Sequence, residues 1–398
     1  MIQRQAYKYR LKTKPTDELL MRQYAGCCRF VWNKALALQK ERLDAGERIL
    51  SYNKLALLLP EWKQEHSFLA NAPSQTLQQT LMNLDRAIKD AFDPKQPEKL
   101  FPVFKKKGKS RDSFRYPQGF KINGNRIFLP KIGWIGFRRS RKIGGIPRNV
   151  TISRNGLYWF VSIQTEQEVA EPIHPSTSLV GIDRGIKQFA VLSDGTAFAP
   201  FNSFRKVEEK LAREQRKLAR KIRKSKNWFK QKQRITRLHT KAADMRNDYL
   251  HKLTTEISKN HAVVVLEELK VKNMSASAKG TKEAPGKRVK QKSGLNKSIL
   301  DQGWGYFRQM LEYKQARLGG WVVYINPAYT SQTCSKCGHV HPGNRKSQAE
   351  FACLSCGFAA NADLNAAINI SRAGHAQLAC QANGAVMPSA TGTSRMAA

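Results

Sequence analysis

The chain has 398 residues, enough for two or three domains with a sizeable core. Lysine and arginine total 70 against 30 acidic residues, a formal net charge of +40, which excludes an ordinary metabolic enzyme and predicts a polyanionic partner. The amino terminus lacks the apolar core of a signal peptide and no stretch approaches 18 apolar residues, so we expect a nucleic-acid partner, no membrane and a cytoplasmic protein.

The amino-terminal part is predicted to be one strand followed by helices. Residues 7–12 alternate Tyr or Leu with Lys or Arg, which is typical of a half-buried strand with a basic outer face. A helix capped by Thr16 should follow, and a later helix carries apolar residues at helical spacing between residues 77 and 88. Residues 16–93 are therefore interpreted as a small helical unit.

A basic β-rich module is predicted from about residue 100. The segments "FKINGNRIFL" and "NVTISRNGLYWFVSI" each hold an Asn-Gly turn between β-rich runs, a strong hairpin pattern. Residues 101–150 contain 14 Lys/Arg and one acidic residue. We expect a basic β-barrel or sandwich with the helical unit inserted after its first strand; for the "KKKGK" run alone, a solvated loop explains the pattern equally well.

The remaining chain is predicted to alternate strands and helices. We expect three strands in residues 179–198, then two basic helices in residues 205–255 with "SKNW" as the turn between them. Residues 262–269 are continuously apolar up to the glutamates, which indicates a buried parallel strand. After this strand we expect a mobile basic loop at 272–297, a helix at about 299–318, the strand "WVVYINP" and a disordered tail from about 373.

Four of the seven cysteines form two C-x-x-C pairs, Cys334/Cys337 and Cys353/Cys356, with 15 residues between the pairs. This spacing can close a tetrahedral four-sulfur shell around Zn²⁺, which leaves no open position and makes one structural zinc ion the prediction. A pair of disulfides or unpaired buried thiols are the alternatives, and His339 or His341 could replace one cysteine ligand. Cys27 and Cys28 are expected to be core packing.

Three acidic residues lie where apolar strands end or a helix begins: Asp183 after "LVGI", Glu267 after "VVVL" and Asp363 in "CGFAANADLNAAINI". Burying a lone carboxylate is costly unless a cation compensates its charge. Three acids from two neighbouring strand ends and one helix can hold two Mg²⁺ ions, as in phosphodiester hydrolysis. Taken singly, each acid has a plainer explanation: Asp183 as a turn residue, Glu267 as a surface strand end and Asp363 as a helix cap.

The element order β-β-β-α-β-α-β-α, with acids after the first and fourth strands and at the last helix, describes an RNase H-like fold. Glu268 competes with Glu267, because adjacent residues of a strand point to opposite faces and only one can join Asp183. The residues alone leave this choice open.

Four ordered motifs, "GIDRGIKQFAV", "VVVLEELKVKNM", "YTSQTCSKCG" and "CGFAANADLNAAINI", closely resemble those of TnpB, the nuclease encoded by insertion sequences and related to type V CRISPR effectors. With the start "YKYRLKTKP…CCRFVWNKAL", the resemblance covers about residues 1–372. It implies that the catalytic, magnesium-binding acids are Asp183, Glu267 and Asp363, with Mn²⁺ able to replace Mg²⁺. Many members carry another acid at the position of Asn361, so Asp363 is the only candidate there.

The resemblance also implies a domain plan and partners. The plan is a wedge-like basic β-barrel (1–15 and 94–175), a helical recognition domain (16–93), a RuvC-like nuclease domain (176–330 and 358–372), a zinc-ribbon module (331–357) and a disordered tail (373–398). The implied function is RNA-guided cleavage of double-stranded DNA beside a short flanking motif, with a guide RNA from the transposon end. One protein chain per guide RNA and a nucleoid-associated prokaryotic protein are expected.

Six basic residues are expected to follow a nucleic-acid backbone from a single predicted helix, with a solvated helix face as the alternative. They are Arg216, Lys217, Arg220, Lys221, Arg223 and Lys224. Two other functions compete with the nuclease: a guided DNA-binding repressor that has lost cleavage, and a DDE-type transposase. Retention of all three acids argues against the first. The basic module before the first acid and the late cysteine module argue against the second.

Overall fold

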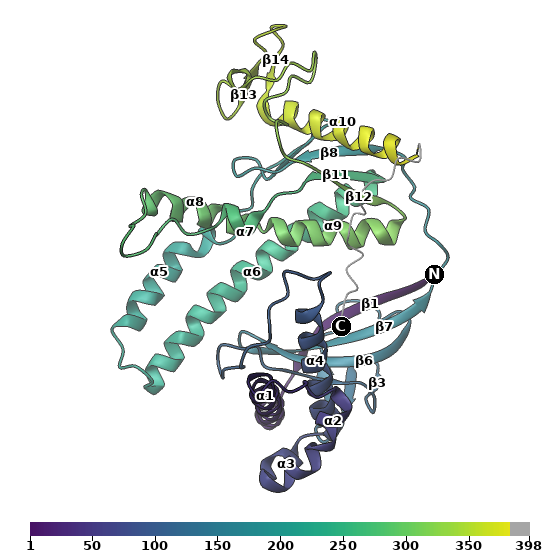
Figure 1. Ribbon diagram of the computed structural model, residues 1–398, viewed down its shortest axis with the longest axis vertical. Helices are drawn as coiled ribbons and strands as arrows, with labels where there is room; N and C mark the ends of the chain where they lie inside the picture. Colours follow the sequence, from purple (N-terminus) through teal and green to yellow (C-terminus); the bar gives the residue numbers. More distant parts are fainter. Residues whose placement is uncertain (383–398) are drawn as a thin grey trace. The chain divides into compact units, whose positions relative to one another are not determined.

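The computed structural model describes residues 1–382, which divide into two compact units (Figure 1). Unit 1 spans Met1–Ala170 and unit 2 begins at Glu171. Within the described residues, no helix combines the length and apolar character needed to cross a membrane.

Unit 1 contains a seven-stranded antiparallel sheet in the order β2-β6-β7-β1-β5-β4-β3. The two Asn-Gly hairpins are confirmed as β3–β4 and β6–β7, where Gly124 and Gly156 adopt φ of 55° and 59°, the left-handed region that such turns require. The predicted amino-terminal strand is confirmed as β1, with its tyrosines buried. The strands are β1 (Ile2–Lys12), β2 (Ser113–Tyr116), β3 (Lys121–Asn123), β4 (Arg126–Leu129), β5 (Gly133–Phe137), β6 (Ile146–Asn155) and β7 (Tyr158–Glu168).

The helices of unit 1 are α1 (Pro15–Asp44), α2 (Tyr52–Leu57), α3 (Leu59–Glu65), the 3₁₀ helix η1 (Ser67–Asn71) and α4 (Ser74–Phe92). The predicted cap was wrong: Lys14 precedes α1, and its backbone N–H donates to the Asp17 carboxylate at 2.8 Å. Cys27 and Cys28 are buried on α1, as expected for core packing. The apolar residues of α4 face the same core, because α4 packs on α1 and β2.

Unit 2 contains a five-stranded sheet in the order β10-β9-β8-β11-β12. The predicted strands are confirmed, and β11 lies between β8 and β12 with both pairings parallel. Strands β9 and β10 extend the sheet beside β8 by antiparallel pairing. The strands are β8 (Leu179–Asp183), β9 (Ala190–Leu192), β10 (Ala197–Phe198), β11 (Val263–Glu267) and β12 (Trp321–Ile325).

Helices cover both faces of this sheet. One face packs on α6 and α9 through a core that includes Leu250, Ile257 and Phe307, and the other packs on α10 (Figure 1). The helices of unit 2 are α5 (Arg205–Ala219), α6 (Lys226–Asn260), α7 (Val271–Met274), α8 (Val289–Gln302), α9 (Trp304–Leu318) and α10 (Ala362–Ala382).

Two glycines allow α10 to lie directly on the strands. A Cβ at Gly181 in β8 would collide with the backbone of Ala367 and Ser371, and a Cβ at Gly374 would collide with Val265 of β11. The close approach fixes α10 across the strands that end in Asp183 and Glu267, so Asp363 in its first turn is held at the same edge of the sheet.

Three predictions about unit 2 were wrong. The basic loop expected at 272–297 contains α7 and the start of α8, and the helix expected at 299–318 is two helices separated by Gly303, whose φ of 72° interrupts the helical backbone. The tail expected from 373 is helical through Ala382, because α10 continues along the sheet; residues 383–398 lie outside the described part.

Candidate active site and metal centre

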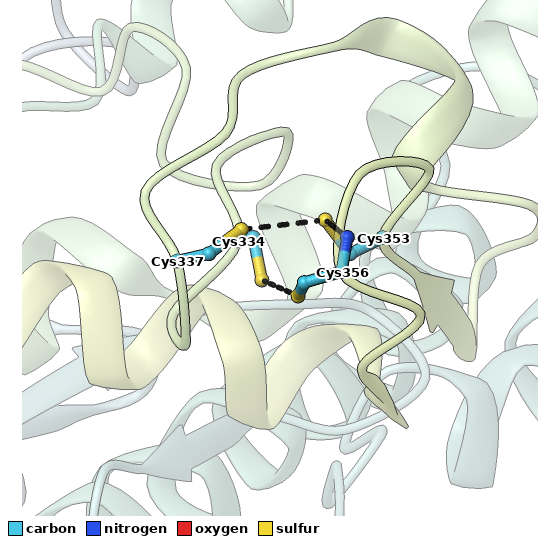
Figure 2. Close-up of side chains that lie close together, drawn as sticks. All are labelled: Cys334, Cys337, Cys353 and Cys356. Carbon is cyan, nitrogen blue, oxygen red and sulfur yellow. Dashed lines mark hydrogen bonds between the residues drawn. The ribbon is translucent and has the colours of Figure 1, made fainter.

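The four predicted zinc ligands lie together at two facing turns, shown in Figure 2. The Sγ atoms of Cys334 and Cys356 are 3.8 Å apart, and those of Cys337 and Cys353 are 3.6 Å apart. A tetrahedron with Zn–S bonds of about 2.3 Å requires sulfur–sulfur separations of about 3.8 Å, whereas a disulfide requires about 2.0 Å. The arrangement therefore fits one zinc ion and does not fit two disulfides.

The backbone of each turn supports thiolate ligands. The N–H of Lys336 donates to Cys334 Sγ at 3.4 Å, and the N–H of Cys356 donates to Cys353 Sγ at 3.5 Å. The second contact lowers the pKa of the Cys353 thiol to about 7. At Cys337 the backbone hydrogen bond at His339 lowers the thiol pKa, but the neighbouring thiols outweigh it and raise the pKa to about 12. Zinc binds thiolates, so metal binding to this cluster should release protons.

The cysteine module is tied to α10 by two buried or half-buried asparagines. The Asn365 side chain accepts from the N–H of Ser335 at 2.9 Å and donates to the carbonyl of Thr333 at 2.8 Å. One turn later, Asn369 donates to the carbonyls of Thr330 and Thr333 at 2.9 and 2.7 Å. The first cysteine turn and the helix that carries Asp363 are therefore one connected structure.

The structure places the three predicted acids at one edge of the sheet of unit 2. Ile182 pairs with Leu266, so the residues that follow them, Asp183 and Glu267, leave parallel neighbouring strands side by side. Asp363 occupies the first turn of α10, and its backbone N–H is capped by the Asn361 side chain at 3.0 Å. In this chain Asn361 therefore serves as a helix cap.

The pKa of Asp183 reports the two neighbouring acids. Burial, followed by the negative charges of Glu267 and Asp363, raises the pKa of Asp183 to about 7. Burial also raises the pKa of Glu267, which is 8% exposed, and its Oε1 accepts a hydrogen bond from Thr330 at 2.6 Å. Glu268 is exposed, so only Glu267 belongs to this cluster.

Two arginines that the sequence reasoning missed accompany the acids. Buried Arg184 donates to the backbone carbonyl of Glu267, and burial lowers the pKa of its guanidinium to about 10. Arg345, from the cysteine module, is ion-paired with Asp363 at 3.1 Å and lowers the pKa of Asp183. The sequence "GIDRG" offered a hint for Arg184, because a basic residue follows an apolar strand; nothing in the sequence pointed to Arg345.

The carboxylates are less tightly gathered than the thiols. Among residues 1–382, the four cysteines are the one group of three or more His, Cys, Asp or Glu side chains that lie close enough to hold a metal ion. Their ligand atoms all lie within 4.8 Å of one another. The acids are adjacent in the fold, with Asp363 held by Arg345.

The burial of Asp183 gives a stability prediction. A carboxyl whose pKa is higher in the folded state than in the unfolded state costs no stability below about pH 4, where both states are protonated. Its cost grows as pH rises from about 4 to about 7 and is complete above about pH 7. Asp183→Asn should therefore raise the melting temperature of zinc-loaded, magnesium-free protein at pH 8, with a gain in the free energy of unfolding of at most about 4 kcal/mol, and should give no gain at pH 4.

Thermal denaturation at the two pH values measures this effect, with exposed Asp248→Asn as the control. Adding Mg²⁺ should reduce the advantage of Asp183→Asn at pH 8, because the aspartate but not the asparagine gains a cation. Equal melting temperatures for wild type and Asp183→Asn at pH 8 would show that Asp183 is not a strained carboxylate.

The six predicted backbone-binding residues do not lie on one helix. Helix α5 ends at Ala219, so only Arg216 and Lys217 belong to it, and Lys217 is ion-paired with Glu214 at 2.9 Å. The other four, Arg220, Lys221, Arg223 and Lys224, lie in the turn before α6. Two local features interrupt the helix between Ala219 and Lys226. Lys224 adopts φ of 68°, and the Ser225 side chain caps a new helix, α6, by accepting from the N–H of Trp228.

Three protein-family models match parts of the chain. Residues 162–278, which hold Asp183 and Glu267, match a family described as "Probable transposase", and residues 304–370 match "Cas12f1-like, TNB domain". Residues 1–48 match a "Helix-turn-helix domain". In this chain those residues form β1 and the single long helix α1, so that description does not fit their structure.

Two curated relatives are similar over nearly their whole length. InsQ of Escherichia coli (strain K12), named as a candidate RNA-guided DNA endonuclease, is 53% identical over 380 residues, 94% of each chain. A protein of Streptomyces pristinaespiralis with the same descriptive name is 34% identical over 388 residues, 95% of this chain and 91% of the relative. The chain belongs to the TnpB family. The resemblance read from the four sequence motifs is thereby confirmed.

The fold of this TnpB protein is shared with Cas12f1. A solved Cas12f1 complex aligns with 90% of this TnpB chain and 83% of its own, with a TM-score of 0.56 and 16% identity. Cas12f1 of Sulfoacidibacillus thermotolerans is 50% identical over 72 residues, 18% of this chain. The fold class is therefore that of the Cas12f effectors, with a TNB domain that contains the cysteine cluster.

Proposed function

We propose that this TnpB protein is an RNA-guided DNA endonuclease that holds a guide RNA from the transposon end and cleaves matching double-stranded DNA beside a short flanking motif. The names of its full-length relatives support the proposal. The observation that carries it is the edge of the unit 2 sheet, where Glu267 and Asp363 lie close enough to Asp183 to raise its pKa. Buried neighbouring carboxylates repel one another unless a cation lies between them, and metal-dependent nucleases bind their cations between such carboxylates.

The proposed domain plan is the one that the TnpB resemblance implies, and the element order supports it. An RNase H-like, RuvC-type nuclease domain (176–330 and 358–372) agrees with the strand order β10-β9-β8-β11-β12 and with acids at the ends of β8 and β11. The sheet of unit 1 (1–15 and 94–175) would be the wedge, whose barrel closure remains part of the proposal. The helices of 16–93 would be the recognition domain, and 331–357 the zinc ribbon.

The residues at the acid cluster fit Mg²⁺. Carboxylate oxygens are the ligands that Mg²⁺ prefers, and burial raises the pKa values of Asp183 and Glu267, so a nearby cation would stabilise their charged forms. Asp183, Glu267 and Asp363 would hold two ions, with Mn²⁺ as a substitute. When bound, such ions activate a water and stabilise the leaving oxygen of a phosphodiester.

The chain's own residues position this site. Thr330 fixes the Glu267 carboxylate by a hydrogen bond, and Arg184 holds the end of β11 through the Glu267 carbonyl. The zinc module fixes the start of α10 through Asn365 and Asn369, and through them Asp363. Arg345 neutralises Asp363 and would have to release it for a second positive charge to approach.

Guidance by RNA suits the distribution of charge. The excess of 40 positive charges is spread over many elements, and such a surface grips phosphate backbones without reading bases. Sequence would then be read by pairing between the guide and its target. The protein would act as one chain per guide RNA in the prokaryotic cytoplasm, in association with the nucleoid.

A transposase is the second candidate, because the family that matches residues 162–278 is described as "Probable transposase". Strand transfer uses the same kind of acid cluster. Similarity over 94% of InsQ, through unit 1 and the cysteine module, favours the nuclease.

The proposal is tested by purifying the full-length protein with its RNA, sequencing that RNA and supplying plasmids that carry the matching target beside randomised bases. Double-strand cleavage should require Mg²⁺ or Mn²⁺ and should select one flanking motif. Cleavage that joins DNA ends to a new site, without dependence on the RNA, would favour the transposase.

A further inference from the structure

The α5–α6 hairpin ends in a strongly basic tip. From residue 215 to 243 the chain contains no acidic residue. The same segment holds twelve basic residues: Arg216, Lys217, Arg220, Lys221, Arg223, Lys224, Lys226, Lys230, Lys232, Arg234, Arg237 and Lys241. In Figure 1 the hairpin projects from the sheet of unit 2 with this tip farthest from the sheet. Contacts with phosphates would explain the basic residues, but not the large apolar side chains that lie among them.

Large apolar side chains stand among these charges. Ile222 in the turn is 82% exposed, and Phe229 in the first turn of α6 is 50% exposed. The ring of Phe229 packs edge-on against Trp228 at 5.2 Å between centroids, and Lys232 lies over the Trp228 ring at 5.1 Å. We call Ile222, Trp228 and Phe229 the tip cluster.

The hairpin holds the tip cluster in place. Ser225 caps α6 directly before the two aromatic residues, and buried Gln231 donates to the backbone carbonyl and the carboxylate of Glu214 on α5 at 2.9 and 2.6 Å. The Gln231 contacts join the two helices within two turns of the tip. The aromatic rings are therefore presented by a braced element, which lowers the entropy lost when they contact a partner.

We propose that the tip cluster stacks on the exposed face of a nucleobase, at a site where the bound nucleic acid is single-stranded or where a duplex ends. Stacking on aromatic side chains tolerates every base, because each base has a π-face, and it commonly accompanies a basic groove that follows the backbone. The charge of the tip selects a polyanion, and the exposed ring of Phe229 selects one with apolar faces. This inference rests on the proposed nucleic-acid function.

The test separates stacking from charge. Full-length protein freed of RNA by high salt is titrated with two short single strands of one sequence, RNA and DNA, each carrying the fluorescent base 2-aminopurine. The variants are Phe229→Ser, Phe229→Tyr and the double charge variant Lys226→Gln with Lys230→Gln. Leu57→Ser is the matched control, since Leu57 is 78% exposed on α2 of unit 1.

Phe229→Ser should weaken binding about tenfold and remove the quenching of 2-aminopurine, with an unchanged salt slope. Phe229→Tyr should retain both the affinity and the quenching. The double charge variant should lower the log–log salt slope by about 0.7 per lost contact on a single strand. The strand with the stronger quenching identifies RNA or DNA as the partner of the tip cluster.

Three results would overturn the inference. The first is unchanged affinity and quenching in Phe229→Ser, and the second is an equal loss of affinity and quenching in Leu57→Ser. The third is a Phe229-dependent association with anionic lipid vesicles or with a second copy of the chain, in place of nucleic acid. Failure of guided cleavage would leave this test intact, because binding and quenching need no cleavage. If the protein does not cleave guided targets but its quenching of 2-aminopurine depends on Phe229, the proposed function is rejected and the inference about base stacking by the tip cluster stands.

Discussion

Asp183→Ala, Glu267→Ala and Asp363→Ala should each abolish DNA cleavage while guide-RNA and target binding are retained. Each change removes a carboxylate from a cluster in which Glu267 and Asp363 already raise the pKa of Asp183. Losing one carboxylate disturbs the balance around both cations, and metal ions supply several kcal/mol of transition-state stabilisation, so we expect a loss of on the order of 10³-fold or more. Single-turnover cleavage with saturating guide RNA measures it.

Glu268→Ala is the matched control, since it removes a carboxylate from the adjacent, exposed position of the same chain segment. It should cleave within a few-fold of wild type. If Glu268→Ala is inactive while Glu267→Ala cuts at the wild-type rate, the assignment of Glu267 is wrong. If all three alanine variants cut normally, the site lies elsewhere.

Cys353→Ser should eliminate the zinc and most of the folded protein. The buried Cys353 Sγ is one corner of the four-sulfur cluster, and structural zinc binding contributes about 10–16 kcal/mol that is also folding free energy. The hydrogen bonds of Asn365 and Asn369 join the module to α10, so its unfolding should also displace Asp363. Elemental analysis should find one zinc per wild-type chain and none in the variant.

Cys380→Ser supplies the control, because Cys380 is exposed on α10 and lies outside the cluster. It should keep its zinc, its yield and its activity. Fully active wild-type protein without zinc would contradict the proposed metal centre.

The secondary structure of this chain was largely predictable because its patterns are local. Asn-Gly turns located two hairpins, and the apolar run before Glu267 located the central parallel strand. The cysteine spacing predicted a cluster whose sulfur separations now fit zinc. The placement of Asp183 beside Glu267 followed from two strands that end at the same edge.

What the sequence could not show depends on contacts between distant segments. Arg345 reaches Asp363 only because the cysteine module folds back on α10, and Asn361 acts as a cap by accepting from the Asp363 N–H. Asn365 and Asn369 are spaced four apart and are poor helix formers, a pattern that predicts contacts off one helix face but not their partners. The basic turn at 220–225 was mistaken for helix because charge patterning does not reveal a left-handed residue such as Lys224.

Exchange of the guide tests the central claim most directly. The guide segment of the copurified RNA is replaced, and the protein is offered a plasmid that carries the new matching target beside the same flanking motif, together with the original plasmid. The account predicts that cleavage moves to the new target, and that protein without RNA cuts neither plasmid specifically. Cleavage that stays at the original site whichever RNA is supplied would contradict RNA guidance.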